Sequence, residues 1–206
     1  NGGNISTECV QYPLMYYYYG TDMLQINDIR KIFCTNKMET YPFSSIYRHK
    51  IYLRYVRGVK VVKPLNYIPY KKEEAMQTLE KEYGWKPYPQ KHFESRFTRF
   101  FEGYWLPERF GFDPRRVQYS SLILTGQMTR DEALERLSKP AYDPETINDE
   151  VNYIATKLGI TTEELQQYFN MPKKYYWDYK NQQNMFRIGA RVLNLIGEEK
   201  VRKRNQ

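Results

Sequence analysis

The stretch KHFESRFTRFFEGYWL, residues 91–106, carries the strongest fold signal in this chain, because five aromatic residues recur in it at helical spacing. That period places them on one face of an α-helix, where they would form part of a buried core. We therefore predict a helix over residues 91–106, followed by Pro107. The five aromatic residues are Phe93, Phe97, Phe100, Phe101 and Tyr104.

The polar residues of the same stretch would form two stripes on this helix. Lys91, Ser95 and Thr98 fall near one line, and His92, Arg96 and Arg99 fall near another. Cationic, hydroxyl and imidazole groups beside a buried aromatic face suit contacts with phosphate and general acid or base chemistry. A solvated helix face has the same composition, and a histidine near Glu94 is also typical of a purely structural residue. Both interpretations stay open at this stage.

Helices are also predicted for most of the chain that follows. One starts at Asp113-Pro114, and the capping-box spacing Thr129–Glu132 starts another. A third begins at either Thr161–Glu164 or Thr162–Leu165. A last helix is expected over about residues 185–196, with its apolar residues on one face.

Upstream of the aromatic stretch the pattern is mixed. Apolar spacing predicts a helix over residues 21–33, capped by Thr21 or Asp22, and a strongly basic helix over about residues 44–57 that Gly58 ends. Residues 59–69 are β-branched and read as one strand, and residues 71–83 read as a helix closed by Gly84. A single strand cannot form a sheet alone. The expected fold is therefore mainly α, with a small α/β remnant near residues 59–83.

A second candidate site is the opening loop Gly2-Gly3-Asn4-Ile5-Ser6-Thr7-Glu8. Small residues allow backbone amides to approach an anion, hydroxyl groups can donate to phosphate, and a carboxylate can hold Mg²⁺ against the same phosphates. A simple glycine-containing loop that precedes a helix has the same sequence. The loop alone is a weak signal.

Arginines supply two further candidates. Arg109, Arg115 and Arg116 surround a turn and a helix start, where they could bind phosphate or form an internal network with nearby acidic residues. The basic helix at residues 44–57 carries interleaved tyrosines that could stack on nucleic acid. Basic residues on an amphipathic helix are more commonly its solvated side, so nucleic acid is not the expected partner.

The amino-acid composition excludes several classes of protein for this chain. The chain has 206 residues and a formal net charge of +8, from 32 Lys and Arg against 24 Asp and Glu. With 41% hydrophobic and 17% aromatic residues, it differs from disordered segments. The 2 cysteines support neither a disulfide framework nor a zinc site. No apolar run is long enough to span a bilayer, and no secretory leader is recognisable, so we expect a cytoplasmic protein.

The quoted motifs, taken together, resemble the C-terminal half of the N-acetyl sugar amidotransferases, which are PP-loop ATPases of bacterial surface-polysaccharide biosynthesis. The resemblance is carried by residues 91–101, 106–116 and 125–134, with support from residues 64–70, 84–85 and 157–164. It implies that residues 1–84 are the C-terminal part of a PP-loop ATP-pyrophosphatase domain, of the adenine nucleotide α-hydrolase type. Residues 85–206 would then be a helical extension.

The resemblance also implies a reaction. Such enzymes convert the acetamido group of a nucleotide-linked sugar to an acetamidino group, in the biosynthesis of lipopolysaccharide O-antigen or a related polymer. ATP adenylates the amide oxygen, and ammonia from a glutaminase subunit displaces AMP. ATP and Mg²⁺ are thus the expected cofactors, and the unpaired strand and many tyrosines are compatible with a homo-oligomer.

The same resemblance implies roles for individual residues. Phosphate and transition-state contacts are expected from Lys91, His92, Arg96 and Arg99, with Glu94 orienting His92 or accepting a proton. The nucleotide would be bound by Gly3, Asn4, Ser6 and Thr7, Mg²⁺ by Glu8, and the sugar diphosphate by Arg115 and Arg116.

One departure from the family is clear. The S-G-G-x-D-S loop that binds pyrophosphate in PP-loop enzymes does not occur in these residues, and the chain starts at Asn1 rather than at Met. We therefore expect this chain alone to be incomplete and inactive, with further sequence upstream. The alternative is a noncatalytic fragment that serves as a protein-binding or nucleic-acid-binding module.

Overall fold

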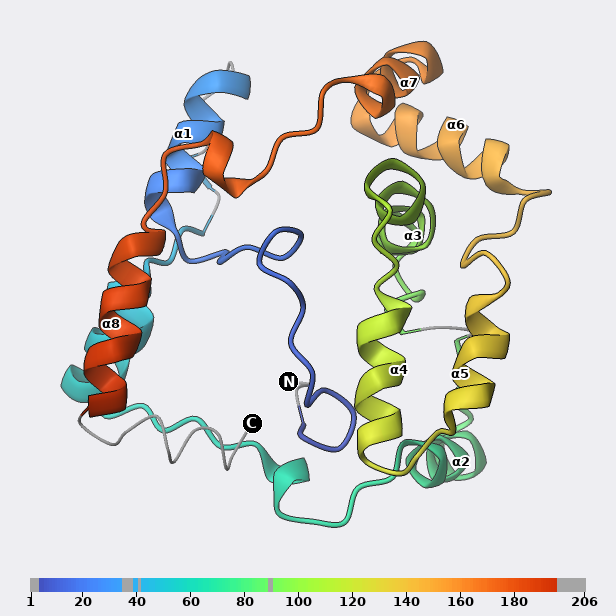
Figure 1. Cartoon of the computed structure of the whole chain (residues 1–206), viewed down its shortest axis with the longest axis horizontal. Helices are drawn as coiled ribbons and strands as arrows, with labels where there is room; N and C mark the ends of the chain where they lie inside the picture. Colours follow the sequence, from blue (N-terminus) through green and yellow to red (C-terminus); the bar gives the residue numbers. More distant parts are fainter. Residues whose placement is uncertain (1–3, 35–38, 41, 89–90, 196–206) are drawn as a thin grey trace. The chain divides into compact units, whose positions relative to one another are not determined.

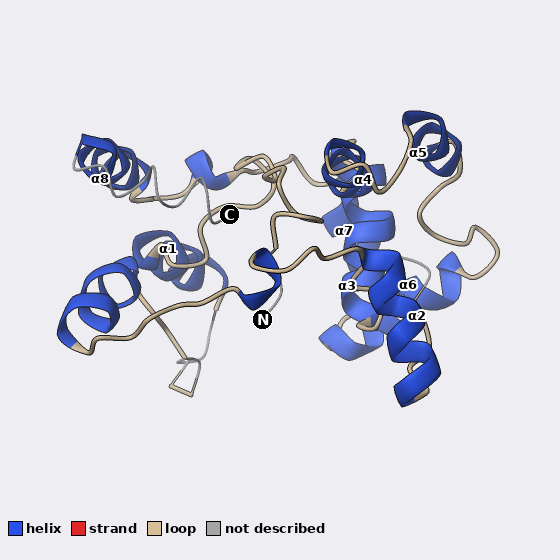
Figure 2. Cartoon of the chain, turned by 90° about the horizontal axis from the view of Figure 1, so that it is seen from below, coloured by secondary structure: helices blue, strands red, loops and turns tan. Residues whose placement is uncertain are grey.

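A computed structural model describes residues 4–34, 39–40, 42–88 and 91–195 (Figure 1). Within these residues the chain is helical and contains no strand, as Figure 2 shows, so the predicted mainly-α class is confirmed. None of the described helices has the length and apolar character needed to cross a bilayer. The α-helices are α1 (Met23–Phe33), α2 (Lys72–Tyr83), α3 (Arg96–Phe100), α4 (Arg115–Leu124), α5 (Arg130–Leu137), α6 (Ile147–Leu158), α7 (Thr162–Asn170) and α8 (Gln183–Leu195). Two π-helices, η1 (Arg48–Val56) and η3 (Phe101–Phe110), and two 3₁₀ turns, η2 (Pro64–Asn66) and η4 (Tyr176–Asp178), complete the set.

Local capping signals start several of these helices where the sequence predicts. The Asp22 side chain accepts hydrogen bonds from the first turn of α1. Thr129 and Thr161 each form a complete capping box, with Glu132 and Glu164 respectively, before α5 and α7. At the end of α2, Gly84 takes the left-handed conformation that favours glycine.

The chain divides into two compact units, each described here by itself. Unit 1 contains the described residues of 12–67 and 174–195, and unit 2 contains those of 4–11 and 68–173. These units are defined by which residues lie close together in space. The boundary predicted at residue 84 separates a PP-loop domain from a helical extension, and it stays a prediction.

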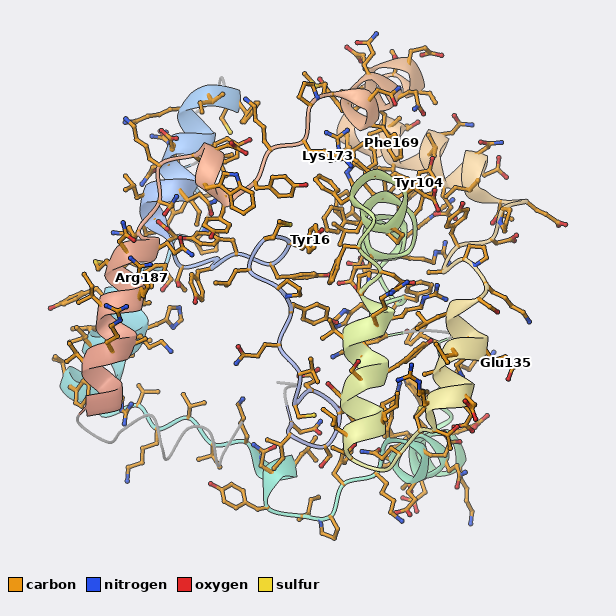
Figure 3. All side chains as sticks on the ribbon, viewed as in Figure 1. Tyr16, Tyr104, Glu135, Phe169, Lys173 and Arg187 are labelled. Atoms are coloured by element: carbon orange, nitrogen blue, oxygen red, sulfur yellow. The ribbon has the colours of Figure 1, made fainter. Side chains whose placement is uncertain are left out.

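Unit 2 is built on an aromatic core. Phe100 at the end of α3 packs with Ile154 and Ala155 of α6 and with Leu165 of α7, and all four are buried. The rings of Tyr104 and Phe169, both labelled in Figure 3, stack with centroids 5.8 Å apart. The aromatic face predicted for residues 91–106 therefore supplies the core only in part, because Phe100 is buried and Tyr104 packs against it, whereas Phe97 is 51% exposed.

Two local predictions are wrong. Residues 91–94 form a turn, not a helix, because Ser95 acts as the N-cap of α3 and accepts a hydrogen bond from the Thr98 amide. The two stripes that begin at Lys91 and His92 therefore do not exist as one helix face. The helix also continues past residue 106, since the wider π-helical turn of η3 accommodates Pro107 in its interior.

The strand predicted at residues 59–69 is also wrong. Residues 59–63 have no regular structure, and the chain then forms the 3₁₀ turn η2, which begins at Pro64. A strand needs a neighbouring backbone for its hydrogen bonds, and no other strand occurs in the described residues. The helix α2, expected next along the chain, is formed.

Unit 1 contains a fully buried carboxylate, that of Asp22, with 0% exposure. It accepts hydrogen bonds from the Leu24 and Gln25 amides at 3.0 Å, from the Tyr18 hydroxyl at 2.7 Å and from the Gln182 amide at 2.6 Å. Asp22 thus joins the start of α1, the tyrosine-rich segment before it and the residue that precedes α8.

This arrangement predicts a loss of stability at alkaline pH. Burial, aided by the hydrogen bond to Asp22, raises the pKa of the Tyr18 hydroxyl above its ordinary value. Because the folded pKa exceeds that of the unfolded chain, Tyr18 contributes full stability below about pH 10 and loses it as the pH rises further. Between about pH 10 and 12, the free energy of unfolding should fall more steeply for the wild type than for Tyr18→Phe. Equal slopes for the two proteins would contradict this role.

Candidate functional site

The opening loop of the chain is ordered by the side chain of Asn4. The Asn4 Oδ1 atom accepts hydrogen bonds from the Ser6 amide at 3.0 Å, from the Thr7 amide at 2.9 Å and from the Thr7 hydroxyl at 3.2 Å. Asn4 is buried, and its carbonyl accepts from the Glu8 amide at 3.0 Å. The loop is therefore a compact Asx-type turn. Gly2 and Gly3, which belong to the predicted nucleotide loop, lie outside the described residues.

Helix α4 and the residues after it hold this loop. Thr125 and Gln127 both donate side-chain hydrogen bonds to the Ser6 carbonyl, at 2.7 and 2.6 Å. Further along, the Val10 amide donates to the hydroxyl of the fully buried Ser121 at 3.0 Å. Figure 1 shows the opening segment running alongside α4. These contacts fix the carboxylate of Glu8 relative to α4.

Glu8 forms an ion pair with Lys91. The two residues lie 83 positions apart, and both side chains are about one-third exposed. The structure thus brings together one residue from each of the two segments that the sequence singles out for phosphate chemistry. Lys91 reaches Glu8 from the turn that precedes α3.

A second lysine lies near this pair. Gln127, which donates to the loop, also accepts a hydrogen bond from the Lys72 amide at the start of α2, at 2.8 Å. The pKa of Lys72 is lowered from its ordinary value, mainly because its ammonium is buried. The nearby positive charges of Lys91 and Arg136 lower it further. Lys91 and Arg136 therefore both lie within electrostatic range of Lys72, and the Glu73 carboxylate acts in the opposite direction. An anionic group bound among these cations would relieve their mutual repulsion.

Sequence reasoning missed Lys72 and Arg136. Lys72 follows another lysine and reads as part of a solvated helix, and Arg136 lies within the acidic and basic sequence of α5. Only Gln127, in the run of residues 125–134 that carries the family resemblance, pointed to this part of the site. No local sequence pattern predicts that Gln127 contacts both the opening loop and α2.

His92 has an uncommon backbone conformation, and its side chain contacts a different carboxylate from the one predicted. Its φ of 67° lies in the left-handed region, which is uncommon for a residue with a side chain. The Nδ1 atom lies 3.3 Å from Oε2 of Glu102, a buried residue of η3. Glu94, predicted to orient His92, is exposed to solvent. The orienting contact in this structure thus comes from Glu102.

Arg96 and Arg99 lie in a different environment from Lys91. Both pair with Glu150 of α6, through Arg96 Nε at 2.9 Å and Arg99 Nη2 at 2.8 Å. The Arg96 guanidinium also stacks over the Tyr153 ring, 3.6 Å from its centroid. These contacts hold α3 against α6. Their predicted role in pyrophosphate binding stays a prediction.

The two arginines expected to bind the sugar diphosphate also differ from each other. Arg115 is buried, and its guanidinium makes a bidentate pair with Asp113, with the shortest contact at 2.7 Å. It also donates to the carbonyls of Arg136 and Lys139, at 3.1 and 2.8 Å. This is the internal network that the sequence left open as an alternative. Arg116, the next residue, is exposed.

The described residues do not form a metal site by themselves. They contain no group of three or more His, Cys, Asp or Glu side chains placed to share an ion. Glu8, the predicted Mg²⁺ ligand, is a single carboxylate already paired with Lys91. Its role as a metal ligand stays a prediction. Cys9 and Cys34 are both exposed, and neither forms a disulfide in the part of the chain that the structure describes.

A shallow hollow along α7 lies apart from the predicted site residues, none of which lines it. Its lining is mostly amide and apolar side chains with a single carboxylate, which offers no acid and base pair for catalysis. The lining residues are Thr162, Glu163, Gln166, Gln167, Asn170 and Met171.

Comparison with models of protein families gives a match to part of the chain. Residues 94–193 match the family model described as "LPS biosynthesis protein WbpG-like, C-terminal domain". No curated protein and no solved structure gives a significant match to the chain. This region is therefore similar to the C-terminal domain of WbpG-like proteins, which links the chain to lipopolysaccharide biosynthesis. The matched region begins just after Lys91 and His92.

Proposed function

We propose that this chain is part of an ATP-dependent amidotransferase of lipopolysaccharide biosynthesis. Its substrate would be a nucleotide-linked N-acetyl sugar, whose acetamido group becomes an acetamidino group. The family match supports the pathway. The observation that carries the chemistry is the Glu8–Lys91 ion pair beside the ordered opening loop, with the Lys72 ammonium within electrostatic range of Lys91.

The reaction needs activation because an amide carbon is a poor electrophile. In the first step the acetamido oxygen attacks the α-phosphorus of ATP, which forms an O–P bond and releases pyrophosphate. In the second step ammonia adds to the activated carbon, and AMP leaves with the former amide oxygen. The added nitrogen loses one proton, which gives the amidine in its protonated, amidinium form. Ammonia is expected from a separate glutaminase subunit.

Both steps build negative charge that cations can stabilise. A phosphate group bound between Lys72 and Lys91 would meet two positive charges, with that of Arg136 within electrostatic range of Lys72. Binding of an anion would also raise the pKa of Lys72, which burial and its cationic neighbours lower.

His92 is suited to the proton transfer of the second step. Its Nδ1 atom faces the Glu102 carboxylate, which fixes the ring and favours the tautomer with a proton on Nδ1. The Nε2 atom would then accept the proton that ammonia loses. Glu102 acts through His92 and is a positioning residue in this scheme.

The first step can be tested by ATP–pyrophosphate exchange in the presence of candidate UDP-linked N-acetyl sugars. We expect Lys72→Gln and Lys91→Gln each to slow exchange by about 100-fold, as for loss of a charged transition-state contact. Lys81→Gln, on an exposed position of the same helix as Lys72, should leave the rate unchanged. The assay should use the protein as the cell produces it, since the S-G-G-x-D-S loop does not occur in these residues.

Two outcomes would contradict different parts of the proposal. If Lys72→Gln and Lys91→Gln exchanged at the wild-type rate, the site would be wrongly placed. If the wild type showed no exchange with any N-acetyl sugar, the reaction itself would be wrong.

A further inference from the structure

The net positive charge of this chain originates in one part of the sequence. Residues 40–72 contain eight Lys and Arg and no Asp or Glu, whereas the rest of the chain has 24 of each. The whole formal charge of +8 therefore comes from this stretch. Within unit 1 it includes residues 47–63, which we call the basic segment.

The basic segment is also one of the most exposed parts of the chain. No residue in it is buried. Leu53 and Lys63 are half-buried, and all the others are exposed. Val61 is 85% exposed, which is unusual for a β-branched apolar side chain. The other large exposed apolar or aromatic residues of the segment are Tyr47, Ile51, Tyr52, Tyr55, Val56, Val59 and Val62.

The π-helix η1 explains how these residues are arranged. Its hydrogen bonds connect residues five apart, so side chains four and five positions apart lie one above another. Tyr47 is followed at these spacings by Ile51 and Tyr52, and these by Tyr55 and Val56. The exposed apolar residues thus form one stripe. Leu53, the least exposed residue of η1, falls outside that stripe.

Cations border this apolar stripe on both sides. Arg48 and Arg57 fall on one flank of it by the same spacing, and Lys50 and Arg54 fall on the other. Lys60 and Lys63 then alternate with the exposed valines that follow η1. An exposed apolar stripe with cationic flanks is the pattern of a helix that lies in the interface of an anionic bilayer.

We propose that the basic segment docks this protein on the surface of membranes that contain anionic lipids. The aliphatic side chains distinguish this surface from one for nucleic acid. Stacking on bases uses aromatic rings, whereas exposed Ile and Val side chains gain free energy by entering the boundary of the acyl chains. Residues 40–72 contain no Asp or Glu, so the side chains of the basic segment itself do not repel a negative surface. This inference is independent of the amidotransferase reaction.

The test is sedimentation of the full chain with vesicles. We expect binding to vesicles of phosphatidylcholine with about 30% phosphatidylglycerol, and little binding to phosphatidylcholine alone. Raising the salt from about 0.1 M to 1 M should release most of the bound protein, because the screening length falls to about 3 Å.

Two variants and one control separate charge from apolar contact. The triple variant Arg57→Gln, Lys60→Gln, Lys63→Gln should bind about 100-fold more weakly, because each cation near an anionic surface strengthens binding roughly five-fold. The double variant Val61→Ser, Val62→Ser should bind about 10-fold more weakly while keeping its salt dependence. A control that loses the same charge at exposed sites elsewhere should bind within about 3-fold of wild type; it combines Lys31→Gln, Lys81→Gln and Lys174→Gln.

Several results would overturn the proposal. Equal binding to both kinds of vesicle, or no binding at low salt, would show that anionic lipid is not recognised. An equal loss in the triple variant and the control would show that the attraction is spread over the whole protein. Binding of a single-stranded oligonucleotide with the vesicles left unbound would identify a nucleic-acid surface instead. Circular dichroism of all variants should match the wild type, since the changed side chains are mostly exposed.

Discussion

Replacing Arg115 with leucine is expected to lower the free energy of unfolding by about 3 to 4 kcal/mol. Arg115 has a side chain only 7% exposed, and its partner Asp113 is 16% exposed. The substitution leaves the Asp113 carboxylate without its cation and the carbonyls of Arg136 and Lys139 without a donor. A buried ion pair costs most when a single partner is removed. Urea unfolding followed by circular dichroism would measure the loss.

Arg116→Leu is the matched control, because it removes the same charge from the next residue, which is exposed. We expect it to change the free energy of unfolding by less than about 0.5 kcal/mol. Arg115→Lys should fall between the two, since an ammonium cannot make the bidentate contact of a guanidinium. Equal stability of the Arg115→Leu and Arg116→Leu proteins would refute the structural role.

The same pair of variants bears on the predicted diphosphate site. A residue that only binds the sugar nucleotide would raise the KM for that substrate without lowering stability. A residue that only joins the start of α4 to the end of α5 would lower stability first. Arg116 is therefore the better candidate for a substrate contact, because its side chain lies at the surface.

Local signals explain why much of the helical structure could be predicted. The capping boxes before α5 and α7, the Asp22 cap of α1 and the Gly84 end of α2 each involve residues within three or four positions. Such contacts form wherever the sequence permits them. The same reasoning failed at residues 91–94, where aromatic spacing suggested a longer helix. Ser95, a favourable N-cap residue, was the signal for the true start.

The candidate site could be predicted only in part, because its contacts join distant segments. The loop around Glu8 and the region around Lys91 were both identified by residue type, but their ion pair spans 83 positions. Glu150, which binds Arg96 and Arg99, comes from a helix about fifty residues further on. Sequence spacing states which residues share a face of one element. It does not state which face of another element they meet.

A second large effect is expected from Asp22→Ala in unit 1, about 4 kcal/mol of unfolding free energy. The substitution removes the N-cap of α1 and leaves donors at the buried Gln25 and at the half-buried Tyr18 and Gln182 without their acceptor. Hydrogen bonds to an ionised acceptor are the stronger class, so the loss exceeds that of a single neutral cap. Asp28→Ala on the same helix is the control, because Asp28 accepts from one amide only in the described contacts, that of Lys180. It should cost about 1 kcal/mol or less.

Amide hydrogen exchange would locate the effect of Asp22→Ala as well as measure it. The amides of Leu24, Gln25 and Gln182 donate directly to the Asp22 carboxylate, so their protection should fall most. Amides of α6, in unit 2, should keep their protection, since their core contains no residue of unit 1. A uniform loss over both units would mean that Asp22 supports the fold as a whole. Unchanged protection at Gln182 would mean that the buried carboxylate does not hold the start of α8 to α1.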